Sequence, residues 1–95
     1  MNDSDTAIAK YESAFRAGVP AAIGDVIVLE VSRWRPAAGP SYAYAQAVGY
    51  RTDTAFGAFS THTVIYAHER DHWYLECGHY DLPTRHAAQQ DVMTR

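Results

Sequence analysis

The chain has 95 residues, of which 47% are hydrophobic and 20% charged, and its formal net charge at pH 7 is −3. This composition predicts one folded domain and excludes disorder for most of the chain. The negative charge argues against duplex DNA or an anionic membrane as the main partner, because both attract positively charged surfaces.

The sequence predicts a cytoplasmic protein. No apolar run approaches the roughly 18 residues of a membrane span, and the N-terminus lacks the basic and apolar regions of a signal peptide. The single cysteine, Cys77, has no partner for an internal disulfide, which agrees with a reducing compartment.

A helix is predicted over Asp5–Ala17. Apolar side chains recur along one side of it at Ile8, Tyr11 and Phe15. Gly18 favours the end of the helix at that point. The one-sided stripe indicates that this helix packs on another element.

Two strands are predicted next. Residues 25–34, DVIVLEVSRW, are rich in β-branched side chains, and two prolines and a glycine in residues 35–40 end that strand. In residues 41–51, SYAYAQAVGYR, small side chains alternate with larger ones such as Tyr42 and Tyr44. This alternation predicts one face of small residues, which a helix can approach closely, and one face of tyrosines.

A hairpin is predicted over Phe59–Tyr80, after a turn at Thr52–Gly57. Its own turn is placed at Glu69–Asp71. Two registers of its strands compete, and a slip of one residue moves every side chain to the other face of the sheet.

We prefer the register that places Ile65 opposite Leu75 and Ala67 opposite Trp73. It continues the separation of the second strand into an aliphatic face and a face of Tyr and His. The other register instead pairs Val64 and Tyr66 with Trp73 and Leu75.

A last helix is predicted over residues 84–94, entered through Asp81–Thr84. We therefore expect a single α+β domain over residues 1–95, built as an N-terminal helix, a four-stranded antiparallel meander and a C-terminal helix. Both helices are expected to cover one sheet face, which carries Ile27, Leu29, Ala43, Ala45, Ile65 and Leu75.

The opposite face is expected to be uncovered and to carry Tyr42, Tyr44, Tyr50, Tyr66 and Tyr74. So much aromatic area indicates an interface, either with a protein partner or with a second copy in a homodimer, unless the face closes on itself as a barrel. The residues expected to bind are Tyr42, Tyr44, Tyr66, Tyr74 and His68, with Trp34 and Arg35 at the rim.

Two other kinds of binding stay open. Proteins that bind single-stranded RNA stack bases on sheet aromatics beside arginines, although the net negative charge argues against this function. The arginines near the predicted sheet tyrosines are Arg33, Arg35 and Arg51. A metal site would use His62, Cys77 and His79, which lack the paired spacing of zinc ligands.

We expect neither enzymatic activity nor a cofactor. The chain has no phosphate-binding loop, nucleophile elbow or dinucleotide fingerprint. Side chains two residues apart on a strand, such as Cys77 and His79, are separated by about 6.8 Å along it, which is too far for a thiolate–imidazole pair.

The ending WYLECGHYDLPTRHAAQQDVMTR resembles the C-termini of small uncharacterised proteins from actinobacterial phages. In those proteins a strand end of the GHYD type leads into a short helix that closes with an acidic residue and an arginine. The resemblance implies a small, non-enzymatic accessory protein that binds and modulates a host protein. It assigns no role to any individual residue.

Overall fold

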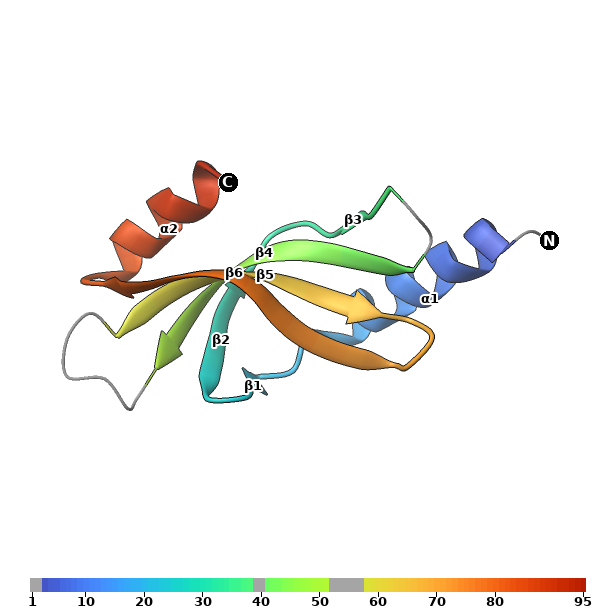
Figure 1. The fold of residues 1–95 in the computed structure, drawn as a ribbon, viewed down its shortest axis with the longest axis horizontal. Coiled ribbons are helices and arrows are strands. Elements are labelled where there is room, and N and C mark those ends of the chain that lie inside the picture. The colour runs from blue at the N-terminus through green and yellow to red at the C-terminus, as the bar shows by residue number, and fades with distance from the viewer. Residues whose placement is uncertain (1–2, 39–40, 52–57) are drawn as a thin grey trace.

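The computed structural model describes residues 3–38, 41–51 and 58–95, and within them it has the predicted α+β class (Figure 1). The elements in chain order are α1 (Asp3–Ala17), β1 (Ala22–Ile23), β2 (Val26–Val31), β3 (Arg35–Pro36), β4 (Tyr42–Arg51), β5 (Phe59–Ala67), β6 (His72–Leu82) and α2 (Arg85–Met93). The turn predicted at Thr52–Gly57 lies outside the described residues.

The antiparallel sheet has the strand order β1-β2-β4-β5-β6, and the short strand β3 pairs with β4. The four predicted strands correspond to β2, β4, β5 and β6, but a four-stranded meander is incomplete because β1 and β3 also join the sheet. These two strands have two residues each, which is too short for a periodic pattern to show in the sequence.

The register of the β5–β6 hairpin differs from the one that we preferred. Tyr66 pairs with Trp73, and Ile65 pairs with Tyr74. The cause is the turn, which has four residues, 68–71, instead of the expected three. Its last residue, Asp71, has a φ of 48° and accepts a hydrogen bond of 2.6 Å from the Tyr66 hydroxyl. The additional turn residue shifts the pairing by one and reverses the faces of one strand relative to the other.

The continuous pairing of β4 with β5 defines two sheet faces. The inner face carries Ala43, Ala45, Ala47, Val64 and Tyr66, and the outer face carries Tyr42, Tyr44, Gln46, Thr63 and Ile65. Strand β1 comes close to β6, so the sheet curls around the inner face.

Helix α1 covers one end of the inner face. Tyr11 is 1% exposed, and its ring meets the Tyr66 ring edge-on, with the centroids 6.4 Å apart. Ala43 is fully buried beneath them, because its small side chain lets the helix approach the sheet. Phe15 stacks on Trp34 and meets Trp73 edge-on. This aromatic cluster is the main hydrophobic contact between α1 and the sheet.

Helix α2 lies on the outer face, so the expectation that both helices cover one face is wrong. Asp91 contacts Thr61 on the outer side of β5, and Arg85 donates a 2.8 Å hydrogen bond to Glu30. Figure 1 shows the two helices at opposite ends of the molecule's long axis. The physical reason is that α2 has a single buried apolar residue, Ala88, and therefore docks mainly through polar side chains.

Two irregularities interrupt β6. Two residues of β6, Cys77 and Gly78, stand against one of β5 between Glu76 and His79, and two more, Tyr80 and Asp81, stand against one between His79 and Leu82. Each additional residue is a β-bulge that bends the strand. Cys77 and Asp81 occupy these places with φ of 54° and 60°, which is uncommon for residues other than glycine.

The different positions of Tyr66 and Tyr42 predict different losses of stability when each is replaced by alanine. Tyr66→Ala opens a cavity between α1 and the sheet and should lower the free energy of unfolding by about 3–5 kcal/mol. Tyr42→Ala removes a side chain that is 38% exposed and should cost about 1 kcal/mol or less. Urea titration of both variants measures the difference, and equal losses would contradict the placement of Tyr66 beneath α1.

Candidate functional site

The end of the outer face that α2 does not cover carries a row of apolar and aromatic side chains across three strands. Tyr44 on β4 pairs with Ile65 on β5, and Ile65 pairs with Tyr74 on β6. Ile65 is only 4% exposed between the two half-buried tyrosines, and Tyr42 extends the row along β4. We call these four residues, Tyr42, Tyr44, Ile65 and Tyr74, the aromatic platform.

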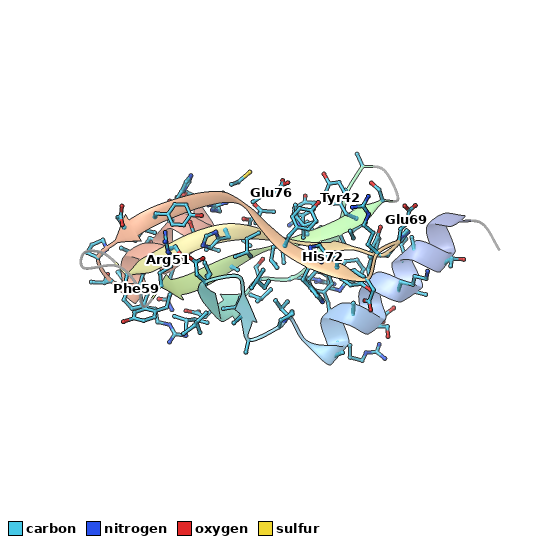
Figure 2. All side chains as sticks on the ribbon, turned by 60° about the horizontal axis from the view of Figure 1, so that its bottom comes forward. Tyr42, Arg51, Phe59, Glu69, His72 and Glu76 are labelled. Atoms are coloured by element: carbon cyan, nitrogen blue, oxygen red, sulfur yellow. The ribbon has the colours of Figure 1, made fainter. Side chains whose placement is uncertain are left out.

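The platform borders two open depressions that meet at Tyr44 and Gln46. One has a volume of about 400 Å³ and is lined by Ala37, Ala38, Tyr42, Tyr44, Gln46, Thr63, Ile65, Glu76 and Cys77. The other, of about 410 Å³, is lined by Ser32, Arg33, Arg35, Tyr44, Ala45, Gln46, Val92, Met93 and Arg95. Figure 2 shows Tyr42 and Glu76 on the same side of the sheet. The surface is therefore aromatic in its centre, cationic on one side and acidic on the other.

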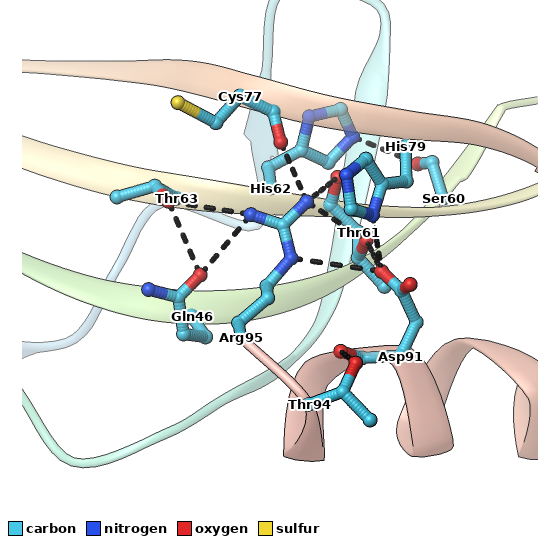
Figure 3. A network of polar contacts seen from close by, with 10 residues as sticks. All are labelled: Gln46, Ser60, Thr61, His62, Thr63, Cys77, His79, Asp91, Thr94 and Arg95. Carbon is cyan, nitrogen blue, oxygen red and sulfur yellow. Dashed lines mark hydrogen bonds and ion pairs between the residues drawn. The ribbon is translucent and has the colours of Figure 1, made fainter.

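A polar network holds the end of α2 against the sheet and so limits the platform on that side (Figure 3). The Asp91 carboxylate accepts a hydrogen bond from the Thr61 hydroxyl and lies 2.8 Å from Nδ1 of His79. The hydrogen bond from Thr61 holds the pKa of Asp91 below its ordinary value, although burial raises that pKa. The hydrogen bond and charge of His79 and the charge of Arg95 lower it further.

The Arg95 guanidinium completes this network. Its side chain is only 10% exposed, and Nη2 donates to the backbone carbonyl of Cys77 at 2.5 Å and to that of Thr61 at 3.2 Å. Nη1 reaches the side chains of Gln46 and Thr63 at 3.3 and 3.4 Å. The bulge at Cys77 thus supplies a carbonyl that helps to anchor α2, and the sequence offered no sign of this contact.

The residues expected to bind a partner divide between the two faces. Tyr42, Tyr44 and Tyr74 lie together in the platform, and Arg35 pairs with Tyr44 at its border. The other three lie on the α1 side and take part in packing.

Each of these three contacts the α1 cluster. Tyr66 is 5% exposed, and Trp34 stacks on Phe15 with ring centroids 5.7 Å apart. The His68 ring lies 5.4 Å from that of Tyr11. The expectation that Tyr66 and His68 lie on the uncovered face, with Trp34 at its rim, is therefore wrong: Tyr66 pairs with Ala43 on the inner face, and Trp34 and His68 pack near α1.

The three candidate metal ligands do not converge. His62 lies on the inner face with Nε2 2.8 Å from the Ser60 hydroxyl, whereas His79 faces Asp91 on the outer side. Cys77 is exposed in its bulge. In the part of the chain that the structure describes, no three His, Cys, Asp or Glu side chains are placed to hold one metal ion.

His62 is a buried titratable group inside the curled sheet. It is 1% exposed and its ring meets the Tyr80 ring edge-on at 5.3 Å. Burial lowers the pKa of His62 below 6.5, and the positive charges of Arg95 and Arg51 lower it further, while Asp25 raises it. The native chain therefore favours the neutral imidazole more strongly than the unfolded chain does.

This burial predicts a pH dependence of stability. The unfolded chain binds a proton at His62 below pH 6.5 and the native chain does not, so stability is complete above pH 6.5 and falls as the pH decreases towards the lower native pKa. Between pH 7.5 and 5.5 we expect the free energy of unfolding to decrease, by at most about 1.4 kcal/mol, because one imidazole contributes no more than one proton over the single pH unit below 6.5. Urea midpoints at both pH values measure it, with His62→Gln as the control. An unchanged pH dependence in that variant would contradict the assignment.

Comparison with known proteins gives no match to any protein-family model, curated protein or solved structure. Neither described helix combines the length and the apolar character needed to cross a membrane.

Proposed function

We propose that this chain is a binding protein, not an enzyme, and that the aromatic platform binds a protein partner. The observation that carries the proposal is the row Tyr44–Ile65–Tyr74, which has Tyr42 beside it and belongs to the part of the outer face without a helix. Helix α1 lies on the inner face, and the polar network fixes α2 over the other end of the outer face.

The chemistry of the surface favours a protein over other partners. Tyrosine combines a large rigid contact area with a polar hydroxyl, and it is enriched among the residues that dominate protein interfaces. Arg35 on one side and Glu76 on the other offer charges of both signs. Such a mixture suits a protein surface better than a uniformly anionic partner.

The class of partner follows from the C-terminal resemblance. Residues 73–95 resemble the ends of small phage proteins, and this resemblance implies an accessory protein that acts on a host protein. The partner would then be a host protein in the cytoplasm, and binding at the platform would modulate it.

A second candidate function is the binding of single-stranded RNA. Arg33 and Arg35 line the depression that Tyr44 borders, and such proteins combine stacking aromatics with neighbouring arginines. The net charge of −3 makes this candidate the weaker one.

A capture experiment tests the main proposal. The native chain and a Tyr42→Ser/Tyr44→Ser variant are immobilised and exposed to an actinobacterial lysate, and bound proteins are identified by mass spectrometry. We expect one host protein to bind the native chain and the variant to bind it about 30-fold more weakly in calorimetry, since a central tyrosine contributes about 2 kcal/mol.

The matched control is Ile8→Gln, which changes an apolar side chain, 43% exposed, on α1. It should bind like the native chain, and circular dichroism should show all three proteins folded. A partner that the folded double variant binds as tightly as the native chain would contradict the proposal. Retention on single-stranded RNA that decreases with salt and is lost in the double variant would favour the second candidate instead.

A further inference from the structure

Strand β6 forms a long edge of the sheet. It is the last strand in the order β1-β2-β4-β5-β6 and has 11 residues, His72–Leu82. Within the described residues, no strand pairs with the side of β6 that faces away from β5. Such an edge presents backbone donors and acceptors that another strand can pair with.

The two bulges restrict where a new strand can pair. They lie at Cys77 and Asp81, both with positive φ, and a bulge disturbs the spacing of backbone groups that a ladder needs. The part of β6 before them, His72–Glu76, is regular. A partner strand therefore has five residues available.

We propose that a second copy of this chain pairs antiparallel with His72–Glu76, about a two-fold axis at Tyr74. In that register His72 stands opposite Glu76 of the second copy, and Trp73 stands opposite Leu75 of the second copy. Tyr74 stands opposite itself. The two-fold axis repeats each pair, so the dimer contains two imidazole–carboxylate pairs and two pairs of an aromatic ring with an aliphatic side chain. Such pairs stabilise neighbouring strands.

Symmetry limits the choice of register. With a two-fold axis perpendicular to the sheet, the outer faces of both copies lie on the same side. Residues that stand opposite each other must share a face, so the residue at the axis stands opposite its own copy. A centre at Trp73 or Leu75 would pair only three of the five residues. The centre at Tyr74 pairs all five and places each imidazole opposite a carboxylate, and a self-complementary pattern is what a contact between identical chains requires.

The exposure of these residues agrees with the proposal. His72 and Glu76 are exposed, and Trp73, Tyr74 and Leu75 are half-buried. Tyr74 belongs to the aromatic platform, so the pairing would join two platforms into one continuous outer face. The dimer does not depend on what the platform binds.

Cross-linking tests the register. In a Cys77→Ser background, Tyr74→Cys places two thiols directly opposite each other with Cα atoms about 4.5–5.5 Å apart, which is within disulfide range. Glu76→Cys in the same background is the matched control. In the dimer the two cysteines of this variant lie four positions, roughly 13 Å, apart along the strands. We expect mild oxidation to convert the first variant to a covalent dimer at least ten times faster than the second.

A charge exchange tests the pairing without cysteine. Light scattering of the native chain at high micromolar concentration should give twice the mass of 10.6 kDa. His72→Glu places two carboxylates opposite each other and should raise the dissociation constant several-fold, and His72→Glu/Glu76→His should restore it, because it exchanges the pair without removing it. A native chain that is monomeric, equal cross-linking rates for the two cysteine variants, or a dimer that His72→Glu does not weaken would each overturn the proposal.

Discussion

Two strand pairings determine which tyrosines form the core and which form the surface: that of β4 with β5, and that of β5 with β6, whose register is set by the four-residue turn. Because Tyr66 pairs with Ala43, the Tyr66 ring lies beneath α1, and because the turn pairs Tyr66 with Trp73, the Trp73 ring lies on the same face. Ile65 and Tyr74 then fall on the outer face beside Tyr44. The bond from Tyr66 to Asp71 joins the register to the turn itself, and the Asp71 carboxylate together with burial raises the pKa of Tyr66 to about 12. If the turn had one residue fewer, the side chains of β6 would point to the opposite face of the sheet.

The position of the helices follows from the chemistry of the two faces. The inner face offers alanines and aromatic rings, and the apolar stripe of α1 packs on them. The outer face offers hydroxyl and amide groups near Thr61, which bind Asp91 of α2 and Arg95, two residues after the helix. Helix α1 covers the inner face at one end and α2 covers the outer face at the other, so the aromatic platform stays uncovered on the outer face at the end where α1 lies. This division supports the proposal of binding, because no helix covers the three platform tyrosines, of which Tyr42 is exposed and Tyr44 and Tyr74 are half-buried.

Periodicity was sufficient to predict the two helices and the four longer strands, but it could not predict β1 and β3 or the relative positions of the elements. Two-residue alternation in residues 41–51 and the three-to-four-residue spacing in α1 mark each element from its own side chains. The register depended on one turn residue, and an aspartate at positive φ gives no signal comparable to that of glycine. The face of α2 depended on polar contacts from Arg95, which in sequence is only a terminal arginine. Three of the expected tyrosines, Tyr42, Tyr44 and Tyr74, nevertheless lie together, because the alternation in β4 identified its outer side.

The composition of the outer face is tested most directly by proton–proton Overhauser contacts in solution. The Tyr66 ring should show contacts with the Tyr11 ring, whose centroid lies 6.4 Å away edge-on, and with the Trp73 ring at 4.7 Å. The side chain of Ile65 should show contacts with both Tyr44 and Tyr74. Contacts of the Tyr66 ring with Tyr44 in place of Tyr11 would contradict the register and remove the basis for the aromatic platform.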